Sequence, residues 1–90
     1  MKIIVVSGGF DPIHSGHIAM FQEAAMMGDI VIVGLNSDDW LTRKKGKPFM
    51  PFVERKAVLG AIQWVDAVWD FNDSDGTAKD LLDNVRQYYT

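Results

Sequence analysis

Two short runs of apolar residues constrain the fold of this chain most. Ile3–Val6 is a continuous β-branched run, and Ile30–Leu35 is a second unbroken apolar run. Runs of this length are typical of strands that are buried on both faces, as in a parallel sheet. Between them, apolar residues over about 15–27 repeat at helical spacing, and Gly28 stands where a glycine commonly closes a helix. The pattern predicts a strand–helix–strand unit with a right-handed crossover.

The rest of the chain continues this alternation. We expect a short helix around Trp40, a loop over Lys44–Pro51, a helix over about 53–64, a strand at Ala67–Phe71 and a last helix capped by Thr77. The predicted fold class is therefore α/β: one domain over residues 1–90, with a Rossmann-like open parallel sheet and flanking helices. Such sheets usually have about five or six strands, so we expect the chain to be truncated at its C-terminal end.

Composition and charge exclude several classes of protein. The chain is 48% hydrophobic and 23% charged, which is typical of a globular domain, and its net charge of −3 argues against nucleic-acid binding. There is no cysteine for disulfide or thiolate chemistry. No apolar run reaches the roughly 20 residues that span a bilayer, so we expect no membrane partner and a cytoplasmic location. Six of the nine basic residues lie between Arg43 and Lys56, which indicates either a solvated loop or a site for a small anion.

The turn after the first predicted strand contains the residues most suited to chemistry. Gly8 and Gly9 stand where phosphate binds in doubly wound folds, although neither a dinucleotide fingerprint nor a P-loop is present. His14 and His17, the two histidines of the chain, are three residues apart at the start of the predicted helix, so they share one face. We expect Gly16, between them, to leave room for a ligand near the backbone. This pattern predicts a phosphate-binding turn with two imidazole donors.

The run Gly8–His17 resembles the G-x-F-D-x-x-H-x-G-H motif of the cytidylyltransferase-like nucleotidyltransferases, which have a HUP-type fold. Met27–Asp29, Asn36–Asp38, Lys45–Pro48 and Glu54-Arg55 are similar to stretches of glycerol-3-phosphate cytidylyltransferases and of the adenylyltransferase domain of ADP-heptose synthesis. The resemblance implies transfer of CMP or AMP from CTP or ATP to a sugar- or polyol-phosphate, with release of pyrophosphate. It also implies Mg²⁺ that arrives with the nucleotide. We further expect a homodimer.

The same resemblance implies a role for each matching residue. Lys44 or Lys45 would neutralise phosphate charge, and Asp11 would either contact the ligand or cap the following turn. Asp38 is also part of a turn rich in helix-capping residues. No residue is expected to be a dedicated metal ligand. The implied catalytic residues are His14, His17 and Lys44; the implied nucleotide-binding residues are Gly8, Gly9, Phe10, Asp11, Gly16 and Lys45; the implied substrate-binding residues are Arg55 and Asp38.

Two other functions remain open from the sequence. An adenylyltransferase of the nicotinate-mononucleotide or phosphopantetheine type has a similar first motif, notably over Asp11–His14. A non-catalytic nucleotide-binding or assembly module is the second alternative. The G-G-D-type segment and the Ser/Thr-rich motif that usually follow in the family do not occur in residues 1–90. Because those segments carry base selectivity in the family, the sequence leaves the choice between cytidine and adenosine open.

Overall fold

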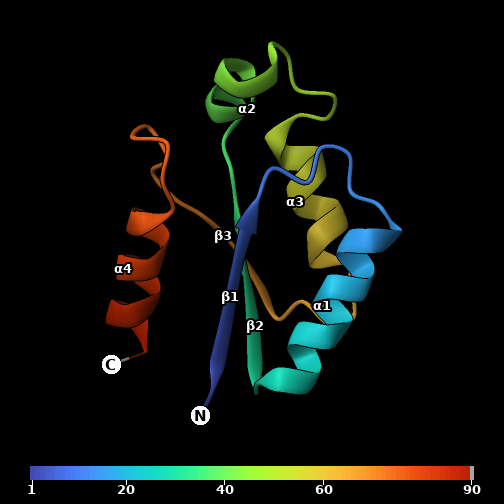
Figure 1. Ribbon diagram of the computed structural model, residues 1–90, viewed down its shortest axis with the longest axis vertical. Helices are drawn as coiled ribbons and strands as arrows, with labels where there is room; N and C mark the ends of the chain where they lie inside the picture. Colours follow the sequence, from blue (N-terminus) through green and yellow to red (C-terminus); the bar gives the residue numbers. More distant parts are fainter. Residues whose placement is uncertain (90) are drawn as a thin grey trace.

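The structure is a computed structural model in which residues 1–89 are described. Over these residues a three-stranded parallel sheet has the strand order β1-β2-β3, with β2 in the centre (Figure 1). Ile3 of β1 pairs with Ile30 of β2, and Ile32 of β2 pairs with Ala67 of β3. The α/β class and the parallel sheet predicted from the sequence are confirmed. The elements in chain order are β1 (Ile3–Gly8), α1 (Ser15–Met27), β2 (Ile30–Leu35), α2 (Asp38–Lys45), α3 (Phe52–Gly60), β3 (Ala67–Asp70) and α4 (Lys79–Tyr88).

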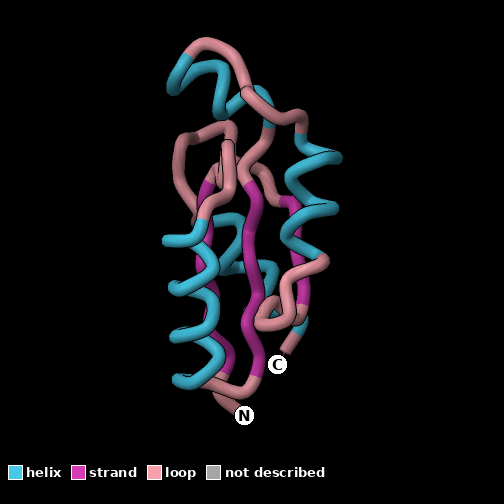
Figure 2. Tube along the Cα trace, turned by 90° about the vertical axis from the view of Figure 1, so that its right-hand side faces the viewer, coloured by secondary structure: helices cyan, strands magenta, loops and turns pink. Residues whose placement is uncertain are grey.

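Helices cover both faces of the sheet, which explains why the strands are apolar on both sides. Successive residues of a strand point to opposite faces. Val33 and Leu35 of β2 pack in the core beneath α1 and α3, whereas Ile32 packs with Leu81 of α4 on the other face. Figure 2, which is viewed from the side of α1 and α3, shows these two helices in front of the strands.

The carboxyl ends of the three strands lie at the same edge of the sheet, because the strands are parallel. Figure 1 shows α2 beyond this edge, on the side to which the β1 arrow points. The helices α1 and α3 follow β1 and β2 on one face, and α4 lies on the opposite face after β3. In open α/β sheets, ligands bind outside the carboxyl ends of the strands. The fold therefore directs attention to the loops that follow β1 and β2.

Gly28 closes α1 as expected, in an extended conformation (φ −150°), and a Cβ there would lie 2.6 Å from Cγ1 of Ile4. The structure corrects two other local expectations. Helix α3 ends at Gly60 rather than near Trp64, and Ile62 and Trp64 in the following loop pack against the core. Thr77 precedes the N-cap residue Ala78 of α4 by one position, although its hydroxyl still accepts a bond from the Lys79 amide (3.3 Å).

Candidate active site

A cavity of about 620 Å³ lies at the carboxyl end of β1. Gly16, Asp38 and Arg55, which the sequence placed in the site, are not among its lining residues. The lining residues that were expected from the sequence are Gly8, Gly9, Phe10, Asp11, His14, His17, Lys44 and Lys45; those that were not expected are Ser7, Pro12, Asn36, Trp40 and Leu41. The cavity thus brings to one place the turn formed by residues 8–10, which we call the glycine turn, together with both imidazoles and two lysines.

The side chain of Phe10 anchors the glycine turn. Its backbone has a positive φ of 51°, a region that residues other than glycine seldom adopt. The ring is buried, with 6% of the residue exposed, and its centroid lies 4.9 Å from that of His17 and 5.5 Å from that of Phe21. Because this ring is anchored in the core, the backbone of residues 8–10 lies against the cavity. Strained backbone of this kind is characteristic of functional sites.

His14 and His17 cap the start of α1 reciprocally. The Gly16 amide donates to Nδ1 of His14 (3.0 Å), and the His14 amide donates to Nδ1 of His17 (3.1 Å). The ring centroids are 3.9 Å apart with a tilt of 30°. Burial, together with the neighbouring His14, lowers the pKa of His17. The space beside Gly16 that was expected to admit a ligand is filled by the His14 ring, since a Cβ on Gly16 would lie 2.8 Å from Cε1 of His14.

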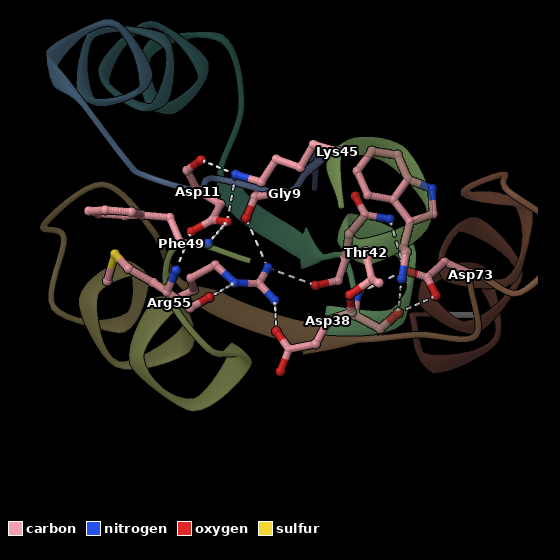
Figure 3. Close-up of polar contacts among 12 residues, drawn as sticks. Gly9, Asp11, Asp38, Thr42, Lys45, Phe49, Arg55 and Asp73 are labelled. Atoms are coloured by element: carbon pink, nitrogen blue, oxygen red, sulfur yellow. Dashed lines mark hydrogen bonds and ion pairs between the residues drawn. The ribbon is translucent and has the colours of Figure 1, made fainter. Parts of the chain in front are cut away.

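Asp11 joins the glycine turn to the loop after α2. Its carboxylate is 1% exposed, pairs with the Lys45 ammonium (2.7 Å) and accepts from the amides of Phe49 and Met50 (both 2.6 Å; Figure 3). Burial by itself would raise the pKa of Asp11, but these hydrogen bonds and the positive charge of Lys45 hold it below its ordinary value. Two roles were left open for Asp11, a ligand contact and a cap for the following turn. Its hydrogen bonds instead give it a third role, which is to order the loop after α2.

Arg55 is the buried centre of the polar network in Figure 3. Its guanidinium donates to the carbonyl oxygens of Gly9 (2.9 Å), Asn36 (2.8 Å) and Met50 (2.9 Å). It also pairs with the carboxylate of Asp38 (2.6 Å). The Arg55 side chain is 0% exposed, so it holds three loops together and has no surface for a substrate. Arg55 therefore lies behind the cavity, in contrast to the direct substrate contact that the resemblance implied. Asp38 pairs with it from outside the cavity lining, and its side chain is 44% exposed.

Asp73 is a structural residue that the sequence analysis missed. Its buried carboxylate accepts from Nδ2 of Asn36 (3.0 Å) and from both the amide and the hydroxyl of Ser37 (2.8 Å each). The Ser37 hydroxyl in turn accepts from the Trp40 amide and caps α2. Burial would raise the pKa of Asp73, but the bonds from Asn36 and Ser37 lower it overall. One feature of the sequence could have indicated this role. Asp73 comes shortly after the third strand, and the carboxyl ends of parallel strands meet at one edge of the sheet.

We expect the free energy of unfolding to fall in acid because of Asp11 and Asp73. Both carboxyls have folded-state pKa values below the ordinary value of about 3.9, so their stabilisation is complete above that pH and disappears as the pH falls through the folded-state values. Urea unfolding measured between about pH 6 and pH 3 tests this. The Asp73→Asn variant should show a shallower decline than the wild type; parallel curves would contradict the assignment.

The remaining polar groups define what the cavity can bind. The Lys44 ammonium lies 4.6 Å from the centre of the Trp40 ring, and Lys45 is held by Asp11. Among residues 1–89, no group of three or more His, Asp or Glu side chains is placed to hold a metal ion. In the same part of the chain, no helix has the length and apolar character needed to cross a membrane. The cavity therefore offers backbone amides, imidazoles and ammonium groups, which suit an anion.

Comparisons with known proteins bear on the family and the fold of this chain. A family model described as cytidylyltransferase-like matches residues 5–89. The bifunctional protein HldE of Pseudomonas aeruginosa is 38% identical over 87 residues, which is 94% of this chain and 18% of that protein. HldE of Citrobacter koseri is 39% identical over 89 residues, or 90% of this chain and 19% of that protein. The chain thus spans about a fifth of the length of these curated relatives.

A solved structure is similar over most of the chain. The lipopolysaccharide core biosynthesis protein from Thermoplasma volcanium superimposes with a TM-score of 0.80 at 23% identity, over 97% of this chain and 67% of that one. At this identity the likeness shows the fold alone, and it supports the Rossmann-like description. The family match over residues 5–89 carries the assignment. This chain belongs to the cytidylyltransferase-like family of nucleotidyltransferases.

Proposed function

We propose that this chain contains the phosphate-binding centre of an enzyme that transfers CMP or AMP from CTP or ATP to a sugar- or polyol-phosphate. The observation that carries the proposal is the cavity at the end of β1, which the glycine turn, His14, His17 and Lys44 all line. Backbone amides beside a helix start bind phosphate well, and imidazole and ammonium groups add donors and positive charge. Membership of the family supports nucleotidyl transfer as the reaction class.

In the proposed reaction, an oxygen of the acceptor phosphate attacks the α-phosphorus of the nucleotide in line. The new phosphoanhydride bond forms as the bond to the β-phosphate breaks, and pyrophosphate leaves with the electron pair. An ionised phosphate is already nucleophilic, so catalysis consists of positioning and charge stabilisation. The backbone of residues 8–10 would hold the α-phosphate, the two imidazoles would donate to phosphoryl oxygens, and Lys44 would neutralise developing charge.

Buried polar residues at and behind the cavity wall serve this site by holding it in place. Arg55 bonds the carbonyl oxygen of Gly9, and Asp11 bonds Lys45 and the loop after α2. We assign both to positioning, together with Asp38, in place of direct ligand contact. Because Lys45 is paired with Asp11 while the Lys44 ammonium lies over Trp40, Lys44 is our choice of the two lysines for phosphate contact.

The Mg²⁺ that the family resemblance implies has no ready-made set of ligands among the described residues. The carboxylate that borders the cavity, that of Asp11, is already bonded by Lys45 and two backbone amides. Mg²⁺ retains several waters and is commonly bound through substrate phosphates. We therefore propose that it enters with the triphosphate, and no step above uses a protein-bound metal.

The assay that tests the proposal measures pyrophosphate release with CTP or ATP against a panel of acceptors. The panel contains sugar and polyol phosphates, nicotinate mononucleotide and phosphopantetheine. Release with a sugar or polyol phosphate supports the proposal and identifies the base. Release with either of the other two acceptors favours the alternative adenylyltransferases. Nucleotide binding without release from any pair favours a binding module. Light scattering on the same sample tests the expected homodimer.

Replacing Lys44 by methionine should weaken nucleotide binding by about tenfold or more, because a hydrogen bond to a charged group contributes about 1.5–3 kcal/mol. Methionine keeps an unbranched side chain against Trp40. Lys47→Met is the matched control, since Lys47 is exposed and does not line the cavity. Titration calorimetry with CTP and ATP measures both variants. Equal losses in the two variants would remove Lys44 from the site.

A further inference from the structure

We propose that the start of helix α1 fixes His14 and His17 as neutral imidazoles that carry their proton on Nε2. In this state the rings meet a phosphate as uncharged N–H donors rather than as cations. The part of the inference that concerns phosphate rests on the proposed function. The part that concerns the rings rests on the capping geometry alone.

The hydrogen bonds at the helix start determine the tautomer. Nδ1 of His14 accepts from the Gly16 amide, and Nδ1 of His17 accepts from the His14 amide. A backbone N–H can only donate, so each Nδ1 must present a lone pair. The single proton of a neutral ring is then on Nε2. A second proton would have to bind Nδ1, where it would face the backbone N–H and break the cap.

The charges around the two rings also favour neutral imidazoles over imidazolium cations. The ring centroids are 3.9 Å apart, so two imidazolium charges would repel each other strongly. The charged residues that share the cavity are Asp11, Lys44 and Lys45. Asp11 and Lys45 neutralise each other as a pair, which leaves Lys44 as the positive charge that lines the same cavity as the imidazoles. Burial and the neighbouring ring lower the pKa of His17, in agreement with a neutral state.

This arrangement has a consequence for phosphate binding. If the rings bound phosphate as cations, protonation would strengthen the binding as the pH falls. Here protonation of His17 removes an acceptor from the His14 amide and disorders the helix start that lines the cavity. Affinity should therefore decline as the pH falls through the pKa of His17, because a binding-competent state that is less populated lowers the apparent affinity in proportion.

Nitrogen NMR of the ligand-free protein, labelled with ¹⁵N in its histidines, tests the tautomer directly. At about pH 7.5, well above the ordinary pKa of histidine, both rings should show a protonated Nε2 and an unprotonated Nδ1. The His14 amide should shift when the pH is lowered and His17 is protonated, because this amide donates to Nδ1 of His17. An Nδ1–H tautomer or an imidazolium in either ring at the starting pH would overturn the inference. No phosphate is present, so this result does not depend on the proposed function.

A second experiment compares the binding of inorganic tripolyphosphate by the wild type and by a His14→Asn/His17→Gln double variant. Asparagine is a good N-cap and glutamine completes a capping box, so the helix start is kept while both imidazole rings are removed. Protonation of the ligand affects both proteins equally. Below the pKa of His17, the wild type should lose affinity more steeply than the variant, by about tenfold for each pH unit.

If the affinity of the wild type for tripolyphosphate falls with pH no more steeply than that of the variant, the proposal that the rings bind phosphate as neutral donors is contradicted. If the wild type fails to bind tripolyphosphate at every pH, the proposed function fails, while the NMR result still decides the tautomer. The two failures are therefore distinguishable.

Discussion

Replacement of His17 by alanine is expected to lower kcat for nucleotidyl transfer by about 10²–10³, the effect of removing one transition-state donor. His17 lines the cavity beside the glycine turn, and its ring packs against Phe10. The measurement is the initial rate of pyrophosphate release with saturating nucleotide and acceptor. Turnover close to that of the wild type would remove His17 from the chemistry.

The His17→Ala experiment needs a control for structure, because His17 also completes the cap of α1. Ser15→Ala is the matched variant: Ser15 is exposed in the same helical turn and does not line the cavity. Circular dichroism and urea unfolding of both variants separate a folding defect from a catalytic one. The expected result is a large fall in kcat in His17→Ala while the protein stays folded, with a loss of stability of about 1 kcal/mol from the missing cap. Ser15→Ala should show neither change.

Replacement of Arg55 by methionine is expected to reduce the free energy of unfolding by about 3–5 kcal/mol, because three carbonyl oxygens lose their donor and each buried acceptor left without a partner costs about 1–3 kcal/mol. The Arg55 side chain is fully buried, and its loss leaves the carbonyl oxygens of Gly9, Asn36 and Met50 without their donor. A domain of ordinary stability, about 5–15 kcal/mol, would lose a large part of it. Urea unfolding monitored by tryptophan fluorescence measures the change.

Lys56→Met is the matched control for Arg55, because Lys56 is the next residue of α3 and is exposed. Its effect should stay within about 0.5 kcal/mol, as is usual for surface substitutions. Asp38→Asn should cost less than the loss of Arg55, since the Asp38 side chain is 44% exposed and water replaces part of the lost contact. Equal effects of Arg55→Met and Lys56→Met would show that the network does not hold the loops together.

Local sequence patterns were sufficient for the elements that build the sheet. The apolar run Ile30–Leu35 and the helical spacing over 15–27 predicted β2 and α1 with the bounds that the structure shows. Each of these patterns lies within one segment of the chain. In each segment the side chains that the folded chain buries are apolar. The position of the glycine turn at the end of β1 followed from the same reasoning, since in this fold class phosphate sites lie at the carboxyl ends of strands.

The supporting network could not be predicted, because its bonds join distant segments. Asp11 bonds an amide 38 residues away, Arg55 a carbonyl 46 residues away, and Asp73 an amide 36 residues away. Periodicity and propensity describe near neighbours and contain no information about such pairs. The motif match implied a ligand contact for Arg55 and left Asp11 between a ligand contact and a turn cap. Neither implication contains the hydrogen bonds by which these side chains join loops of the folded chain.

The most direct test of the central claim is the titration of ¹⁵N-labelled protein with CTP and with ATP, followed by amide and imidazole shifts. The account predicts that the largest shifts occur at Gly8, Gly9 and Phe10 and at the rings of His14 and His17, which line one cavity. Shifts centred elsewhere, such as the cavity bordered by Ser74, Asp75 and Gly76, would contradict it. So would nucleotide binding that leaves the glycine turn and both imidazoles unchanged.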